Sequence, residues 1–176
     1  CIRAERAVLS DLRGAADLML DTRRWSLHDI RSLIYREFGR DAGHEPVMNV
    51  SLVSFGFKHG IPFGADLLFD VRFLPNPHFD PALRPLSGLD EPVREFLRQR
   101  TDFQELLGRL ADLLRFLLPR YQQENRSYLT VGIGCTGGQH RSVALVEALA
   151  AELASRLDAA NWTVRVKHRD LERLRP

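Results

Sequence analysis

The succession of elements after residue 126 constrains the fold of this chain more than any other feature. Residues 127–134 form an apolar segment of strand length, and an alanine- and leucine-rich helix is predicted over residues 141–157. Residues 162–168 then alternate apolar and polar side chains, as a further strand does. A strand–helix–strand order implies parallel strands joined by a right-handed crossover. We therefore predict an α/β fold, with a mixed or mostly parallel sheet and flanking helices.

Two further strands are expected upstream of this unit. Residues 47–55 and 66–73 have the composition of buried strands, and the glycine-rich residues 56–64 connect them. The prolines in residues 74–81 exclude a helix interior and a central strand, so this segment is expected to be an ordered loop directly after a strand. Such loops often carry function.

A long helix is predicted between these strands and residue 127. Leucines with helical spacing run as far as Leu118, and Thr101 and Gln104 have the form of a capping box at its start. Pro119 is expected to end the helix. The apolar stripe is interpreted as core or subunit interface rather than as a ligand site.

A domain boundary is predicted just before the first of these strands, because residues 39–46 are polar, contain glycine and proline, and show no periodicity. We assign residues 1–45 to the tail of another domain with its linker, and residues 46–176 to the main domain. The chain begins with Cys1 rather than methionine, so we expect it to be a piece of a longer protein. The elements expected before the boundary are helices over residues 2–16 and 27–38 and a short strand over residues 17–21.

The composition indicates a globular, cytoplasmic protein. The net charge of +2, from 25 basic and 23 acidic residues, is too small to indicate nucleic-acid binding by itself. Cys1 and Cys135 have neither disulfide-framework nor zinc-ligand spacing, which favours a reducing compartment. No segment reaches the roughly 18 consecutive apolar residues of a membrane span, and residues 1–6 are too charged for a signal peptide, so we expect no membrane association.

The loop between the strand at residues 127–134 and the following helix is predicted to bind an anion. Backbone N–H groups at a helix N-terminus lack partners, and the helix dipole favours negative charge there. Gly137 and Gly138 let the backbone curl around phosphate oxygens, and Arg141 can donate two hydrogen bonds at once. The alternative is a tight turn with a solvent-exposed arginine. The residues assigned to this anion-binding strand–loop–helix, residues 135–142, are Thr136, Gly137, Gly138, His140, Arg141 and Ser142, with Cys135 at its start.

Polar side chains near the second strand of the main domain are candidates to complete the pocket. Asp70, Arg72, Asn76 and His78 follow that strand, and Lys58 and His59 lie in the glycine-rich connection before it. Each is equally well explained as an ordinary surface residue. A zinc site built from His59, His78 and His140 has no recognised local spacing, so we expect neither a metal nor a bound cofactor.

The same loop has a second interpretation, as the active site of a cysteine-dependent phosphatase. Cys135 is followed after five residues by Arg141 and then Ser142, which resembles the signature of those enzymes. A thiolate at the helix terminus would attack phosphorus while the arginine holds the oxygens. Gly134 stands where the family has histidine, and only Asp80 or Asp90 can be nominated as the general acid.

Basic side chains accumulate at the end of the sequence. Trp162, Val164 and Val166 alternate with Thr163, Arg165 and Lys167, which predicts one apolar and one basic strand face. A basic face that continues into a basic tail suits the phosphate backbone of RNA. The alternative is a solvated charged end, because acidic residues are interleaved. The candidate RNA-binding residues are Arg165, Lys167, Arg169, Arg173 and Arg175.

Five segments together closely resemble the C-terminal domain of the RNase adapter protein family, RapZ. These segments are VSFGFKHGIP at residues 53–62, FDVRFLPNPH at 69–78, LSGLDEP at 86–92, NRSYLT at 125–130 and IGCTGGQHRS at 133–142. The resemblance covers roughly residues 50–176. Residues 1–38 resemble the end of that family's N-terminal nucleotide-binding domain, whose GxxxxGK[ST] phosphate loop this sequence does not contain.

The resemblance implies a binding and adaptor domain rather than an enzyme. It implies binding of a small regulatory RNA, contact with an endoribonuclease, assembly into dimers or tetramers, and sensing of glucosamine-6-phosphate in the control of amino-sugar synthesis. Leu174 interrupts the basic run that the family can carry between Arg173 and Arg175. A third interpretation is a subunit whose pocket is vestigial and whose long helix only builds an assembly. The resemblance places the sugar phosphate on His78, Cys135, Thr136, Gly137, Gly138, His140 and Arg141.

Overall fold

The computed structural model describes residues 48–124, 126–156 and 162–171, together with Ala16, Leu20, Ile30 and Leu33. The chain divides into two compact units, residues 1–44 and 45–176. Apart from those four isolated positions, the helices and strand predicted before residue 39, and the linker after them, lie outside the described residues.

One parallel sheet forms the centre of the second unit, and its strand order is β2-β3-β1-β4. All three neighbouring pairs are parallel, so the predicted α/β class is confirmed, with an entirely parallel sheet. β3 and β4 do not pair with each other but lie on either side of β1, so the helical connection between them crosses β1. The strands are β1 (Met48–Gly56), β2 (Leu67–Asp70), β3 (Tyr128–Cys135) and β4 (Trp162–His168).

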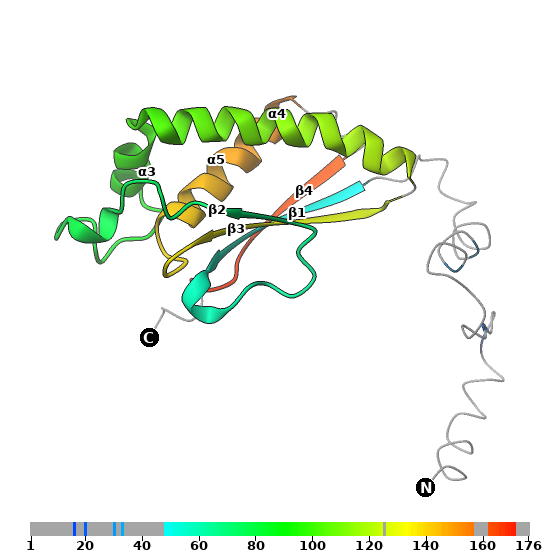
Figure 1. Ribbon diagram of the computed structural model, residues 1–176, viewed down its shortest axis with the longest axis horizontal. Helices are drawn as coiled ribbons and strands as arrows, with labels where there is room; N and C mark the ends of the chain where they lie inside the picture. The colour runs from blue at the N-terminus through cyan, green and yellow to red at the C-terminus, as the bar shows by residue number, and fades with distance from the viewer. Residues whose placement is uncertain are drawn as a thin grey trace, which may run out of the picture. The chain divides into compact units, whose positions relative to one another are not determined.

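Three helices pack around this sheet: α3 (Glu91–Arg98), α4 (Thr101–Gln123) and α5 (Arg141–Arg156). α5 contacts β1, β3 and β4, and α4 lies against α5. Figure 1 shows the three helices gathered on one side of the strands. Two single-turn helices, η2 (Phe57–His59) and η3 (Pro77–Phe79), lie in the connections around β2.

The core lies between one face of the sheet and the helices. Successive strand side chains point to opposite faces, and alternate residues of β1 and β3 belong to the same buried cluster as the inner sides of α4 and α5. Full burial of each such side chain stabilises the fold by roughly 1.5–3 kcal/mol. The strand members are Met48, Val50 and Leu52 with Leu129, Val131 and Ile133; the helical members include Leu114, Leu118, Leu145 and Leu149.

Two predicted boundaries are wrong, and one helix was not predicted. β2 ends at Asp70 rather than at residue 73, because the amide of Leu74 donates to the carbonyl of Val71 and closes a turn whose Val71 and Leu74 side chains enter the core. α4 continues through Pro119 to Gln123, and the buried Leu118 keeps that end on the core. α3 was not predicted, since eight residues with two buried side chains carry little periodicity.

The capping box predicted at the start of α4 is not formed. Arg100 occupies the N-cap position, so Thr101 is already the first helical residue. The Nε2 of Gln104 instead donates to the carbonyl of Arg98, at 2.8 Å, within the connection from α3. None of the helices in the described ranges is long and apolar enough to cross a membrane.

β4 is an edge strand and shows the predicted alternation only in part. Trp162 and Val164 pack against the core, and Arg165 and Lys167 are exposed on the opposite face. Val166 has the register of an inward residue but is 37% exposed, so the apolar face is open at that point.

Candidate functional site

A cavity opens where β1 and β3 end side by side, with Gly56 paired to Cys135. Its volume is about 250 Å³. Binding sites in open parallel sheets lie at the carboxyl ends of the strands, and this cavity has that position. It is lined by Lys58, Asn76, His78, Cys135, Thr136, Gly137, Gln139, His140 and Arg141.

The loop from β3 into α5 forms the floor of the cavity. The carbonyl of His140 accepts the amide of Ala144 at 2.9 Å, so the helix begins with Arg141. The amides of the first turn have no acceptor within the helix and carry the positive end of its dipole. Residues 135–137 and 139–141 all line the cavity at this terminus.

Gly138 gives the loop its bend. Its φ of +77° lies in the left-handed region, which glycine adopts without steric cost. The loop rests directly on the end of β1, because a Cβ on Gly56 would lie 2.5 Å from the carbonyl carbon of Gly137. A Cβ on Gly138 would lie 2.7 Å from the nitrogen of Gly56. The two backbones therefore approach as closely as glycine allows.

Arg141 joins the loop to the segment after β2. Its Nη1 donates to the carbonyls of Arg72 and Leu74, at 2.6 and 3.0 Å, and its Nη2 donates to Thr136 Oγ1 at 3.2 Å. Only 5% of the residue is exposed, so the guanidinium is held in place by the fold. Its Nε–H and one N–H of Nη2 make no hydrogen bond with any described residue and remain as donors on one edge.

Lys58 supplies a second cation. The amide of Lys58 donates to the carbonyl of Thr136 at 3.2 Å, which fixes η2 beside the loop. Its Nζ lies 3.7 Å from the position that a Cβ on Gly137 would occupy. Lys58 makes no ion pair with a described residue, and no aspartate or glutamate lines the cavity. The lining therefore carries positive charge without a compensating carboxylate.

The two histidines of the lining differ in their surroundings. His140 is buried, and its Nε2 lies 3.2 Å from the carbonyl of Leu83. Burial lowers the pKa of His140 below its ordinary value, against the smaller effect of nearby backbone carbonyls. His140 is thus neutral near pH 7 and adds no positive charge to the site. His78 is exposed, with its ring centre 6.3 Å from that of His140.

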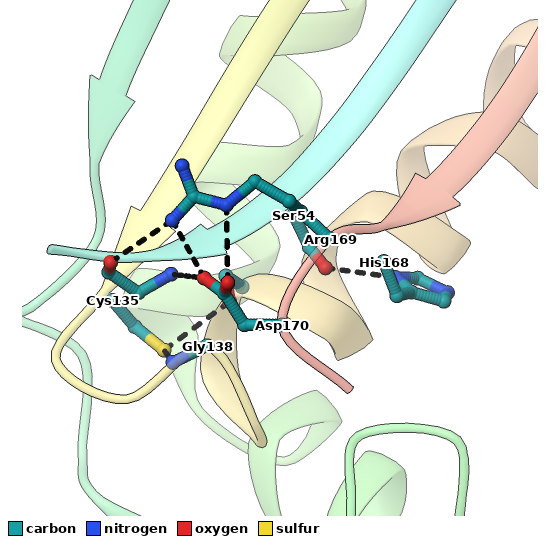
Figure 2. A network of polar contacts seen from close by, with 8 residues as sticks. Ser54, Cys135, Gly138, His168, Arg169 and Asp170 are labelled. Atoms are coloured by element: carbon teal, nitrogen blue, oxygen red, sulfur yellow. Dashed lines mark hydrogen bonds and ion pairs between the residues drawn. The ribbon is translucent and has the colours of Figure 1, made fainter. Parts of the chain in front are cut away.

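Cys135 sits beneath the loop with its thiol held by two neighbours. Sγ lies 3.2 Å from Ser142 Oγ and accepts the amide of Gly138, also at 3.2 Å (Figure 2). Ser142 is fully buried and does not line the cavity. Ser142 and Gly138 therefore support the loop from behind, whereas Cys135 also faces the cavity.

Besides Gly138 and Ser142, two more predicted site residues do not line the cavity. Asp70 and Arg72 form an exposed ion pair, with 2.6 Å between Nη2 and Oδ2. The hydrogen bond from Arg72 lowers the pKa of Asp70, although the little burial at this position acts in the opposite direction. The Arg72 guanidinium lies 4.3 Å from the ring centre of Phe57. Arg72 contributes to the site only through its carbonyl, which holds Arg141.

The acids nominated for phosphatase chemistry have other partners. Asp80 Oδ1 accepts the amide of Ala82, and Asp90 Oδ2 accepts both the amide and the hydroxyl of Ser87. Neither residue lines the cavity. Within the described ranges, no group of three histidine, cysteine, aspartate or glutamate side chains is placed to hold a metal ion. His59, considered for zinc, is not part of the lining.

The structure separates the candidate RNA-binding residues. Arg165 and Lys167 are exposed on β4 and make no ion pair with described residues. Arg169 is engaged, because its guanidinium pairs with the buried carboxylate of Asp170 at 2.7 Å. Arg173 and Arg175 lie outside the described residues.

Gln139 lines the cavity but was not assigned to it from the sequence, and Asn76 was named only within the polar cluster after the second strand. Gln139 donates from Nε2 to the carbonyl of Leu86 at 2.7 Å, which leaves its amide oxygen for a ligand. Asn76 precedes η3 and accepts the amide of His78 at 3.4 Å. The signal for Gln139 was its place inside the loop motif, between two residues that were assigned. Asn76 had only its position after a strand.

Comparison with known proteins identifies relatives over nearly the whole chain. Residues 48–172 match the family model described as the RapZ C-terminal domain. A "Nucleotide-binding protein" from Anaeromyxobacter sp. (strain K) is 52% identical over 98% of this chain and 56% of its own length. Proteins with the same name from Rubrobacter xylanophilus and Heliobacterium modesticaldum are 50% and 47% identical, over 97% and 98% of this chain and 55% and 56% of their own. The chain thus spans little more than half the length of these curated relatives.

Proposed function

This chain belongs to the RapZ C-terminal domain family, and from that premise we propose that it is a binding domain which senses a phosphorylated amino sugar, glucosamine-6-phosphate, in the cavity at the end of β3. The observation that carries the proposal is the lining itself. Backbone amides at a helix N-terminus, Arg141, Lys58 and the Thr136 hydroxyl converge on one space without a carboxylate. This combination favours a phosphate group.

The remaining lining suits a small polyhydroxylated ligand. A cavity of about 250 Å³ is at the small end of ligand sites, which favours a monosaccharide phosphate over a dinucleotide. Asn76, His78 and Gln139 add neutral polar groups that can pair with hydroxyls. The amide oxygen of Gln139 can also accept from an ammonium group, as glucosamine carries.

Calorimetric titration of glucosamine-6-phosphate into the native chain tests the proposal, with unphosphorylated glucosamine as the ligand control. Lys58→Ala removes a cavity cation that has no structural ion pair, so it should weaken binding while the fold is retained. Arg72→Ala removes one positive charge from a side chain outside the cavity and is the matched control. Saturable heat that requires the phosphate and Lys58, but not the Arg72 side chain, is expected. Equal affinity for glucosamine, or equal loss in both variants, would contradict the proposal.

We propose binding without turnover. The thiol of Cys135 receives an N–H as a phosphatase nucleophile does, but no described carboxylate lines the cavity to protonate a leaving group. Phosphate release from the sugar phosphate should therefore stay at background. Release that disappears in Cys135→Ser would favour the cysteine-dependent phosphatase instead.

We propose RNA as a second ligand of this domain, bound through exposed basic residues of β4 and the segment after it. Arg165 and Lys167 support this, because both are exposed on one strand face and neither forms an ion pair with a described residue. Arg173 and Arg175 stay part of the proposal as sequence predictions, whereas Arg169 is already paired. Loss of two phosphate contacts should reduce the slope of log K against log salt by about 1.4 for single-stranded RNA. Arg165→Ala combined with Lys167→Ala should show that change in filter binding; an unchanged slope would remove β4 from the interface.

The remaining proposals, on partners, assembly and regulation, rest on the family to which the chain belongs. We propose that the small regulatory RNA is presented to an endoribonuclease, that the complete protein forms dimers or tetramers in the cytoplasm, and that the sensed sugar phosphate regulates amino-sugar synthesis. Sedimentation of the complete protein with and without RNA would measure the assembly. A monomer under all conditions would contradict that part.

A further inference from the structure

The two residues that follow β4, Arg169 and Asp170, both contact Gly56, on which the anion-binding loop rests. We propose that Asp170 is a positioning residue for this loop, because its carboxylate fixes Gly56, the backbone on which Gly137 and Gly138 rest. The inference rests on the proposed function of the cavity and adds a residue that lies outside its lining.

Asp170 approaches the end of β1 from the side of β4, whereas β3 lies on the other side of β1. Its Oδ2 accepts the amide of Gly56 at 2.7 Å, and the residue has no exposed surface (Figure 2). The amide of Arg169 donates to the carbonyl of Ser54 at 3.1 Å, which continues the β1–β4 pairing up to Asp170. The carboxylate is therefore delivered to Gly56 by backbone pairing rather than by a flexible chain.

Arg169 holds the carboxylate in its ionised form. Its Nη2 lies 2.7 Å from Oδ2 and its Nε 3.1 Å from Oδ1, and the same Nη2 lies 3.3 Å from the carbonyl of Gly56. Burial alone would raise the pKa of Asp170, but the hydrogen bonds from Arg169 and Gly56 outweigh it and the pKa is lowered. The pair thus binds both the amide and the carbonyl of one glycine.

The position of Gly56 determines the position of the loop. A Cβ on Gly138 would lie 2.7 Å from the Gly56 nitrogen and 3.1 Å from the Asp170 Cβ, so no space separates the three residues. Gly138 in turn donates to Cys135 Sγ, and Lys58, two residues after Gly56, donates to the carbonyl of Thr136. A shift of Gly56 would therefore move the cavity floor and the Lys58 ammonium together.

Two substitutions distinguish the effect of the Asp170 charge from the effect of its hydrogen bond to the Gly56 amide. Asp170→Asn keeps an oxygen for the Gly56 amide but removes the charge that pairs with Arg169, whereas Asp170→Ala removes both. The matched control is Val164→Ala, a part-buried core contact on the same strand that has no contact with the loop. Unfolding midpoints are recorded for all variants, so that affinity is compared at equal loss of stability.

Glucosamine-6-phosphate affinity by calorimetry should fall in the order native, Asp170→Asn, Asp170→Ala, with the last about tenfold weaker, by analogy with the loss of residues that orient metal ligands. Hydrogen–deuterium exchange of the peptide covering residues 135–142 should accelerate in the same order. Val164→Ala should change neither. If Asp170→Ala does not fold, the exchange rate of the peptide covering residues 135–142 in Asp170→Asn tests the positioning role.

The two proposals fail in different ways. No heat from the native chain would remove the sugar-phosphate function, but faster exchange of the loop in Asp170→Asn would still support the positioning role. Unchanged exchange and affinity in both Asp170 variants would overturn the inference. The inference would also be overturned if Val164→Ala lost as much affinity as an Asp170 variant that has the same unfolding midpoint.

Discussion

Replacing Gly138 by alanine should destabilise the protein far more than the same change at its neighbour Gly137. Gly138 has a φ of +77°, and a left-handed conformation costs a residue with a Cβ about 1–2 kcal/mol. The added Cβ would also lie 2.7 Å from the Gly56 nitrogen and 3.0 Å from the Phe55 carbonyl carbon, which are backbone atoms. Overpacking of this kind costs roughly 1–3 kcal/mol. The expected loss in the free energy of unfolding is therefore about 2–5 kcal/mol.

Gly137 is the internal control for this prediction. Its φ is not positive, and the nearest atom to an added Cβ is the end of the flexible Lys58 side chain, at 3.7 Å. Both substitutions lower the entropy of the unfolded chain equally, so this effect cancels in the comparison. Gly137→Ala should change the free energy of unfolding by less than about 0.5 kcal/mol.

Urea denaturation followed by circular dichroism measures both variants, and the difference between their extrapolated free energies is the decisive quantity. A difference below about 1 kcal/mol would refute the argument that the loop is pinned against β1 at Gly138. Because Gly137 lines the cavity, its alanine variant should also lose ligand affinity while it keeps its stability.

Three further predictions concern stability alone. His140 should make the free energy of unfolding fall as the pH drops below 6.5, because the pKa of His140 is lowered from 6.5 in the folded state and the unfolded chain binds the proton more readily; His140→Gln should lack this part of the decline in urea titrations at several pH values. Leu114→Ala should cost about 2–5 kcal/mol because the side chain is fully buried, whereas Leu113→Ala, at a site that is 38% exposed, should cost far less in the same assay; equal losses would place the core elsewhere. Gly108→Ala should stabilise α4 by about 0.5–1 kcal/mol, because a Cβ there would meet no atom within 4 Å; a lower melting temperature would contradict this.

Patterns that repeat over many residues predicted most of the fold. The four strands have apolar or alternating runs, and the start of the long stripe of α4 was predicted to within one residue. The strand order was not predictable, because the run of residues 162–168 indicates a strand without indicating which neighbour it pairs with. The prediction that Pro119 ends the helix was wrong for a related reason. The local cost of a proline near a helix end is smaller than the gain from keeping the last turn on the core, and that gain depends on distant residues.

The candidate site was predictable to the extent that it is local in sequence. Residues 135–141 lie in one loop, so their position at a helix terminus follows from the order of elements. Asp170 was not found, because its contact with Gly56 spans 114 residues and its sequence context suggests only a charged tail. Asp70 and Arg72 stay predicted site residues, although neither lines the cavity. They follow a strand as site residues do, but they neutralise each other in solvent.

The central position of β1 has a consequence for how the protein reaches its native state. β1 is the first strand of this unit in the chain, yet its two partners are the last two, and the register pair Ser54–His168 spans 114 residues. During synthesis, β1 keeps an open hydrogen-bonding edge until β4 has left the ribosome. Pairings of such long range close large loops before any contact compensates for the lost entropy, so folding is expected to be slow and late. Until then we expect the exposed strand edge and its apolar face to make the nascent chain prone to aggregation and to favour its binding by chaperones.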